Sequence, residues 1–245
     1  MANWSDPWTT AAGPTGVGQR SAAYDAGLRS YMLSVYNYMA SGVLLTGVVA
    51  LLFANSPYMA MLFPAGRPSL AGYVVMLAPL GVVMWLSFGI SRISETTAKA
   101  LFWAYAVLMG LSLSTVFLAY TGASVAQTFF ASAAAFGGLS LWGYTTKRDL
   151  SGFGSFLIMG VVGIFVAMLV NMFLRSSALD LAISVLGVLL FAGLTAYDTQ
   201  RIKSMYFAVQ GSSFAGKSVI MGALQLYLDF INMFMFLLRF MGDRR

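Results

Sequence analysis

The sequence contains neither cysteine nor histidine. The absence of cysteine excludes disulfides, thiol catalysis and cysteine metal sites. The absence of histidine removes the usual metal ligand and the side chain whose ordinary pKa lies nearest neutrality. A response to pH within this chain would therefore have to use carboxyl groups.

Charge is scarce as well, at 9% of the residues, whereas 59% are hydrophobic and the mean hydropathy is +0.80. A soluble domain has about 25% charged residues, so this composition indicates a polytopic membrane protein. Each spanning helix needs about 20 apolar residues, and lipid leaves no partner for unpaired backbone groups. We therefore predict an all-α membrane protein with seven transmembrane helices, at roughly residues 33–54, 70–90, 98–119, 124–144, 153–174, 179–200 and 218–240.

Residues 1–30 are rich in Gly, Pro, Ser and Thr and lack the apolar core of a cleaved signal peptide. We interpret them as a flexible cytoplasmic N-terminal tail, followed by a seven-helix transmembrane domain over residues 31–245.

The basic residues lie in short breaks between the apolar runs, so the net charge of +6 does not indicate a nucleic-acid-binding surface. They indicate topology, because cytoplasmic loops are enriched in Lys and Arg. A cytoplasmic N-terminus places nine basic residues inside and two outside; the inner set is Arg20, Arg29, Arg92, Lys99, Lys147, Arg148, Arg201, Lys203 and Lys217, and the outer set is Arg67 and Arg175. A full crossing of the seventh segment, which we favour over a re-entrant one, leaves Arg239, Arg244 and Arg245 outside as exceptions.

The fourth apolar segment is rich in small residues, which let helices approach closely in lipid. Its Ala131/Ala135 and Ala134/Gly138 pairs predict helix-packing contacts.

Asp229 lies near the middle of the seventh apolar run. An aspartate at that depth costs about 2.5 to 3.5 kcal/mol on insertion scales, so it should be protonated, paired or facing water. Gln225 and Asn232 lie four residues before and three after it, on the same helix face. We expect this polar face to point into the bundle.

Asp198 permits two interpretations. At 1.5 Å per residue it lies about 27 Å beyond Asp180, near the cytoplasmic edge of a 30 Å slab. There it could be a surface residue bridged to Arg201. Alternatively it meets Asp229, and then the two like charges cannot both ionise easily and share a proton. Ionised, the pair offers oxygen ligands suited to a transient Ca²⁺ ion, although two carboxylates fall short of the usual six to eight oxygens.

Arg92, at the end of the second segment, is a candidate latch that pairs with a carboxylate in one state and is released by protonation. The alternative for Arg92 is an interfacial arginine whose charge reaches the headgroups.

Two motifs, FAGLTAYDTQRIKSMY and IMGALQLYLDFINMFMFLLRFMG, resemble the Bax inhibitor-1 family. The stretches SRISETTAKALFWAYAVLMGLSLSTVF and AYDAGLRSYMLSVYNYMASGVLLTGVVA are similar to its bacterial branch. The resemblance implies a seventh helix surrounded by the other six and a proton-sensitive calcium leak. It also implies that Asp198 and Asp229 form the pH sensor, with a second-helix arginine, here Arg92, as the latch. A bacterial cytoplasmic (inner) membrane location follows, with Ca²⁺ as a permeating ion, no cofactor, and a monomer as the expected state.

Two rivals to a calcium leak channel remain at this point. One is a non-conducting regulator that binds another membrane protein, such as a quality-control protease, with the aspartates serving structure. The other is an intramembrane aspartyl protease, in which paired carboxylates activate water. The sequence departs from that second pattern because Asp229 lies in Tyr-Leu-Asp-Phe without a Gly-x-Gly-Asp element, and we do not expect an enzyme.

Overall fold

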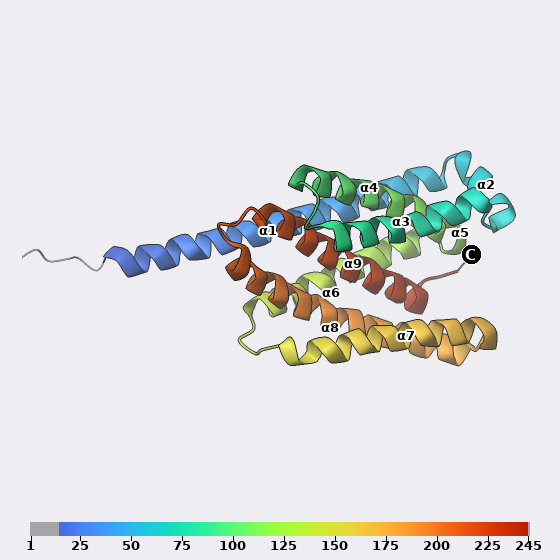
Figure 1. The fold of residues 1–245 in the computed structure, drawn as a ribbon. Helices are drawn as coiled ribbons and strands as arrows, with labels where there is room; N and C mark the ends of the chain where they lie inside the picture. The colour runs from blue at the N-terminus through green and yellow to red at the C-terminus, as the bar shows by residue number, and fades with distance from the viewer. Residues whose placement is uncertain (1–14, 245) are drawn as a thin grey trace, which may run out of the picture.

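The computed structural model describes residues 15–244, which form helices joined by short connections (Figure 1). The elements are α1 (Thr15–Ala54), α2 (Tyr58–Leu62), η1 (Pro64–Gly66), α3 (Leu70–Gly89), α4 (Glu95–Leu113), α5 (Val116–Ala119), α6 (Gly122–Thr145), η2 (Ser151–Phe153), α7 (Gly154–Leu174), α8 (Ser177–Val209) and α9 (Ala215–Met241).

Seven of these segments are long and apolar enough to cross a membrane, as the sequence predicts. The seventh, α9, is an unbroken helix of 27 residues, or about 40 Å, which exceeds a 30 Å hydrocarbon core. A re-entrant segment would need a reversal of direction, and α9 has none. The side of the membrane on which the N-terminus lies stays a prediction.

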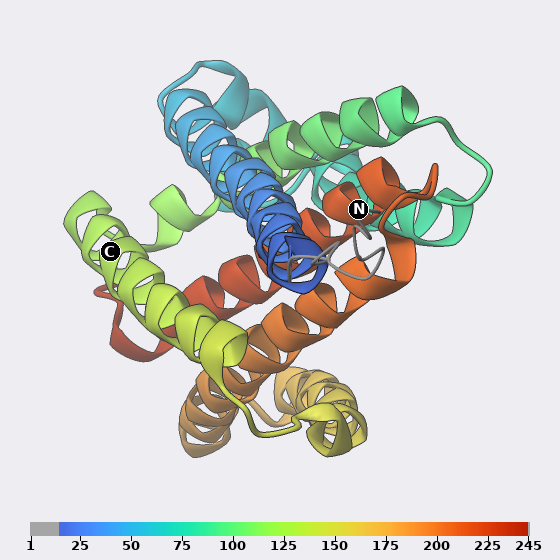
Figure 2. The ribbon, with the colours of Figure 1, turned by 90° about the vertical axis from the view of Figure 1, so that its left-hand side faces the viewer.

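α9 is the most buried of the seven spans. It packs against α8, α1, α6 and α4, whereas α3 packs chiefly on α4 and α7 chiefly on α8 (Figure 2). The predicted encirclement of α9 by all six other helices is therefore not confirmed. Four helices contact it directly, and two lie at the periphery.

Hydroxyl side chains begin four of the spanning helices. Ser69, Ser94, Thr121 and Ser176 each accept a hydrogen bond from the backbone amide three residues further on. Such caps satisfy amides that have no partner within the helix. They explain why α3, α4, α6 and α8 start where the apolar runs start.

The helix boundaries differ from the predicted ones in two places. α1 begins at Thr15, so residues 15–30, which the sequence assigns to the tail, already belong to the first helix. Residues 1–14 lie outside the described part of the chain. α8 continues to Val209, nine residues beyond its predicted end, and this extension places Asp198 well inside the helix.

The small residues of α6 do not pack as predicted. Ala131, Ala134, Ala135 and Gly138 are exposed on the surface of the bundle. The buried face of α6 instead carries residues spaced by about four, namely Ser124, Thr128, Ser132, Phe136 and Ser140. The hydroxyl-bearing positions, and not the alanines, therefore mark the packed face of this helix.

Candidate functional site

Asp198 on α8 and Asp229 on α9 are brought together in the interior of the bundle. Each side chain is only 4% exposed. The two carboxyl groups lie within hydrogen-bonding reach of each other, and the Gln225 side chain also approaches Asp198. Two acidic residues 31 positions apart in the sequence thus meet between two closely packed helices.

One oxygen of each carboxyl group has no hydrogen-bond partner among the described residues. These atoms are Oδ1 of Asp198 and Oδ2 of Asp229. An ionised carboxylate can only accept hydrogen bonds, whereas a protonated carboxyl also donates one. A single proton on either residue would therefore supply the donor that this pair of acceptors lacks.

The crossing of α6 and α8 positions the helix turn that carries Asp198. Gly143 of α6 lies so close to α8 that an added Cβ would be 2.3 Å from the carbonyl oxygen of Ala196. Such an approach between backbones is possible only for a residue without a side chain. Ala196 precedes Asp198 by two positions, so this contact sets the distance of the site from α6.

A chain of hydroxyl groups joins the same part of α8 to α1 and α6. Tyr36 and Ser140 are 2.7 Å apart, and Ser140 and Thr199 are 2.9 Å apart. Thr199 donates its own proton to the carbonyl of Thr195 at 2.7 Å. Because each hydroxyl has a single proton, Ser140 must donate to Thr199 and Tyr36 to Ser140. The chain connects three helices next to Asp198.

A second buried network holds α9 against α1 and α4. Thr46 donates to the carbonyl of Ala106 at 2.8 Å, and its oxygen lies 2.6 Å from the hydroxyl of Tyr227. Since Thr46 uses its proton on Ala106, Tyr227 must be the donor in the second bond. Tyr227 lies two residues before Asp229, so this network fixes the helix turn that carries the second carboxyl group.

The other predicted site residues lie outside this contact. Arg201 is exposed and, within residues 15–244, forms no ion pair with Asp198, so the surface-bridge alternative for Asp198 is wrong. Arg92 is exposed in the connection between α3 and α4, also without an ion pair to any described carboxylate. Asn232 donates to the carbonyl of Leu228 in its own helix at 2.8 Å. Of the predicted supporting residues, Gln225 approaches Asp198 directly, Arg201 acts on it only through its charge, and Asn232 contacts neither aspartate.

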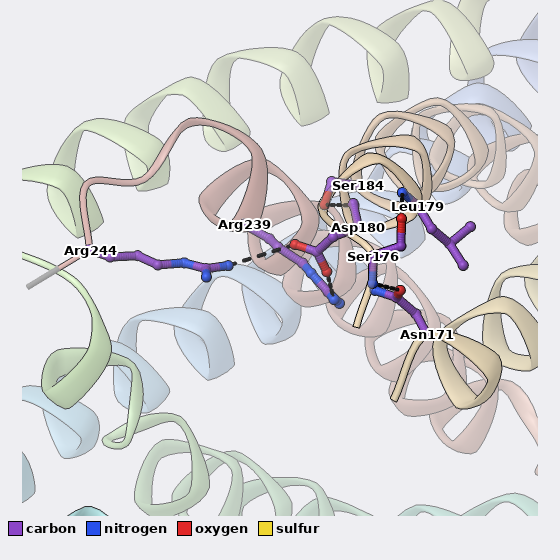
Figure 3. A network of polar contacts seen from close by, with 7 residues as sticks. All are labelled: Asn171, Ser176, Leu179, Asp180, Ser184, Arg239 and Arg244. Atoms are coloured by element: carbon purple, nitrogen blue, oxygen red, sulfur yellow. Dashed lines mark hydrogen bonds and ion pairs between the residues drawn. The ribbon is translucent and has the colours of Figure 1, made fainter. Parts of the chain in front are cut away.

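Sequence reasoning missed an ion-pair network at the opposite end of α8 and α9 (Figure 3). Asp180, in the first turn of α8, pairs with Arg239 near the end of α9, and Arg244 lies 3.7 Å from its other carboxylate oxygen. Because the partners are 59 positions apart, no local spacing signals the pair. The network gives a carboxylate partner to Arg239 and Arg244, two of the three arginines that the predicted orientation leaves outside.

A calcium site built from the aspartate pair would have to borrow further oxygens. Among the described residues, no three carboxylates gather at one point. Asp198 and Asp229 provide at most four oxygens, fewer than the six to eight of a resident Ca²⁺ ion. The donor set therefore fits a transient contact with a passing ion better than tight binding.

The comparisons with known proteins agree with this architecture. Residues 28–245 match a family model described as "Inhibitor of apoptosis-promoting Bax1". The chain belongs to the Bax inhibitor-1 family. It is 48% identical over 222 residues to the inner membrane protein YbhL of Escherichia coli K12, covering 90% of this chain and 94% of YbhL.

Two other bacterial proteins are similar to this chain to about the same degree. An uncharacterized protein of Caulobacter vibrioides is 50% identical over 229 residues, or 90% of this chain and 91% of its own. Protein RP147 of Rickettsia prowazekii is 48% identical over 227 residues, or 92% and 94% of the two chains. Together with the seven spans, the likeness to an inner membrane protein identifies an integral inner-membrane protein.

Proposed function

We propose that this protein is a pH-sensitive calcium leak channel gated by protonation of the Asp198/Asp229 pair, without a catalytic role. One observation carries the proposal. Two carboxyl groups from neighbouring helices meet in a bundle whose other described acidic side chains are not buried. Placing aspartates inside a membrane is costly, and such residues commonly mark ion or proton pathways.

The proposed gate depends on the repulsion between two like charges. In a site of low dielectric constant, two carboxylates in contact cannot both ionise without strong repulsion, so a shared proton holds α8 and α9 together. Each side chain is only 4% exposed, and we assign this conformation to the closed, protonated state. When the proton leaves, the two charges separate the helices and attract cations. Calcium leak should therefore rise as the pH rises.

Arg92 is proposed as a cationic partner of the ionised pair. It is exposed and lies in the connection between α3 and α4, next to the end of the bundle where α9 begins, because Glu95 of the same region contacts Gly216. In the closed state the shared proton leaves the pair with one negative charge instead of two, so the pair attracts a cation less strongly, which agrees with the unpaired Arg92. A guanidinium that approaches after deprotonation would stabilise the ionised state.

Calcium flux into proteoliposomes of one lipid composition, followed with an entrapped calcium dye over about pH 5 to 8, tests the proposal. We expect the wild type to leak more calcium as the pH rises. Asp198→Asn and Asp229→Asn should each abolish this pH dependence, because an amide carries no charge and the remaining carboxylate then has no like charge to repel. Arg92→Gln should move the midpoint to higher pH, because the ionised state loses a partner. Asp149→Asn, which removes an exposed acidic residue in the α6–α7 connection, is the matched control and should behave as the wild type.

The same preparation separates the channel from its rivals. A non-conducting regulator would show no leak at any pH in any variant. An aspartyl protease would cleave a reconstituted substrate and lose cleavage in both aspartate variants. A leak whose pH dependence survives in the Asp198/Asp229 double variant would refute the gating mechanism while leaving conduction standing.

A further inference from the structure

A long apolar groove separates α1 from α6 on one side of the bundle. The two helices do not pack closely on each other, although both contact α9, which lies between them (Figure 2). The part of the groove nearer the start of α1 has a volume of about 640 Å³, and a second part of about 410 Å³ continues toward the other end. The parts share Val43, Leu44, Phe129 and Phe230, so they form one continuous groove.

The groove opens sideways, toward the space that lipid occupies in a membrane. Leu33 and Leu44 on α1 and Leu141 on α6 line it, and each is more than half exposed. Apolar side chains on a rim within the spanning region cannot face water at low cost. The natural neighbour of such a rim is a hydrocarbon chain.

One end of the groove carries a different chemistry. Arg29 lies there, exposed and without an ion pair to any carboxylate among residues 26–64 and 66–244, whose side chains the structure describes. The hydroxyl-bearing residues Tyr36, Ser140 and Tyr144 line the same part. A cation and nearby hydroxyl groups above an apolar groove match the headgroup and tail of a lipid, because basic pockets between transmembrane helices recognise anionic headgroups.

The length of the groove also suits one lipid tail. From Arg29 to Leu44 the helix rises about 22 Å, whereas one leaflet contributes about 15 Å to the hydrocarbon core. A chain that starts at Arg29 can therefore lie wholly within the larger part of the groove, against the aromatic rings of Phe136 and Phe230. We propose that this groove binds one phospholipid with an anionic headgroup, its phosphate on Arg29 and one acyl chain between α1 and α6.

This binding site is independent of the proposed conduction. Neither aspartate lines the groove, and a protein that conducts no calcium would bind the lipid equally well. A bound lipid would nevertheless contact residues linked to the surroundings of Asp198, because Tyr36 and Ser140 line the groove and also belong to the hydroxyl chain that ends at Thr199.

Native mass spectrometry of the full chain, released from micelles that contain equal amounts of phosphatidylglycerol and phosphatidylcholine with the same acyl chains, tests the proposal. We expect one retained phosphatidylglycerol per wild-type chain, preferred over phosphatidylcholine by about fivefold, the effect of one basic residue near the headgroups. Arg29→Gln should reduce this preference to about one. Arg148→Gln removes an exposed arginine of the α6–α7 connection that does not line the groove, and it should keep the preference.

Two neighbouring glycines provide a matched steric test. Gly137 lines the groove and Gly138 does not, yet an added Cβ meets no atom within 4 Å at either position. Gly137→Trp should fill the groove and release both lipids, whereas Gly138→Trp should retain them. Gly137→Leu is the smaller blocking variant, to be used if the tryptophan variant loses its helical circular dichroism.

Three outcomes would overturn the proposal. Equal retention of the two lipids by the wild type would exclude headgroup recognition. Retention that neither Arg29→Gln nor Gly137→Trp changes would place the lipid elsewhere. A retained mass equal to a second copy of this chain, lost in Gly137→Trp, would identify a protein dimer as the occupant.

Discussion

The crossing of α6 and α8 allows a sharp test of how the aspartate site is positioned. In Gly143→Ala, the new Cβ would lie 2.3 Å from the Ala196 oxygen and 2.8 Å from its Cα. Real Cβ atoms keep at least 3.0 Å from such atoms, so the helices must separate by about 0.7 Å or more. Overpacking of this kind costs about 1 to 3 kcal/mol.

Gly138→Ala is the matched control for this substitution. It lies on the same helix, its added Cβ meets nothing within 4 Å, and it gains the same helix propensity of about 1 kcal/mol. Subtracting the two variants removes the propensity effect and leaves the overpacking cost alone. For a chain of this size, 1 kcal/mol shifts the thermal midpoint by about 2 to 4 °C. Gly143→Ala should therefore denature about 2 to 12 °C below Gly138→Ala.

Thermal denaturation of both variants in one detergent and at one scan rate, followed by circular dichroism, measures this difference. The displacement of α8 should also reach Asp198, so calcium flux in Gly143→Ala should lose part of its pH dependence. Equal midpoints for the two variants would show that the α6–α8 approach is not a tight contact, and the account of how Asp198 is positioned would fail.

Three further predictions concern contacts elsewhere in the bundle. Tyr227→Phe removes the hydroxyl that donates to Thr46 and should lower the free energy of unfolding by about 1 kcal/mol, seen as a lower thermal midpoint; an unchanged midpoint would contradict the bond. Arg239→Gln breaks the ion pair with Asp180, in which both side chains are about a quarter exposed. It should lower the free energy of unfolding by less than about 1 kcal/mol, and the difference in thermal midpoint between variant and wild type should become smaller at high salt. The Asp149 carboxylate accepts a hydrogen bond from the backbone amide two residues on, which lowers its pKa, so an NMR titration should give a midpoint below about 3.9. Any stabilisation from that hydrogen bond is present above the pKa of Asp149 in the unfolded chain and is lost as the pH falls through its pKa in the folded chain. A midpoint at or above about 3.9 would contradict the hydrogen bond.

The apolar runs predicted the seven spanning helices closely, because in lipid a helix must satisfy its own backbone and its length follows from the membrane. The same reasoning places Asp229 inside the bundle, since an aspartate near the middle of an apolar segment, with eleven residues of that segment on either side, has few alternatives. Asp198 was ambiguous from the residues alone. Its depth depends on where α8 ends, and the basic residues Arg201 and Lys203 suggested that the helix ends soon after Gln200, whereas it continues to Val209.

Contacts between distant segments could not be predicted in this way. The pairing of Asp180 with Arg239 and the approach of Gly143 to Ala196 depend on how helices cross, which local spacing does not encode. The prediction that Ala131, Ala134, Ala135 and Gly138 of α6 form helix-packing contacts is wrong for the same reason. Composition shows that helices can approach closely there, but it does not show which face another helix occupies.

The burial of α9 has a consequence for biosynthesis. α9 leaves the ribosome after the other six spans, has the largest share of its surface inside the bundle and carries Asp229. Six helices must therefore enter the bilayer before the segment that completes their core exists, and their inward faces contact lipid until it arrives. A ribosome that stalls before residue 215 would leave a membrane-inserted chain that lacks its most buried helix and exposes to lipid the helix faces that α9 covers in the finished protein.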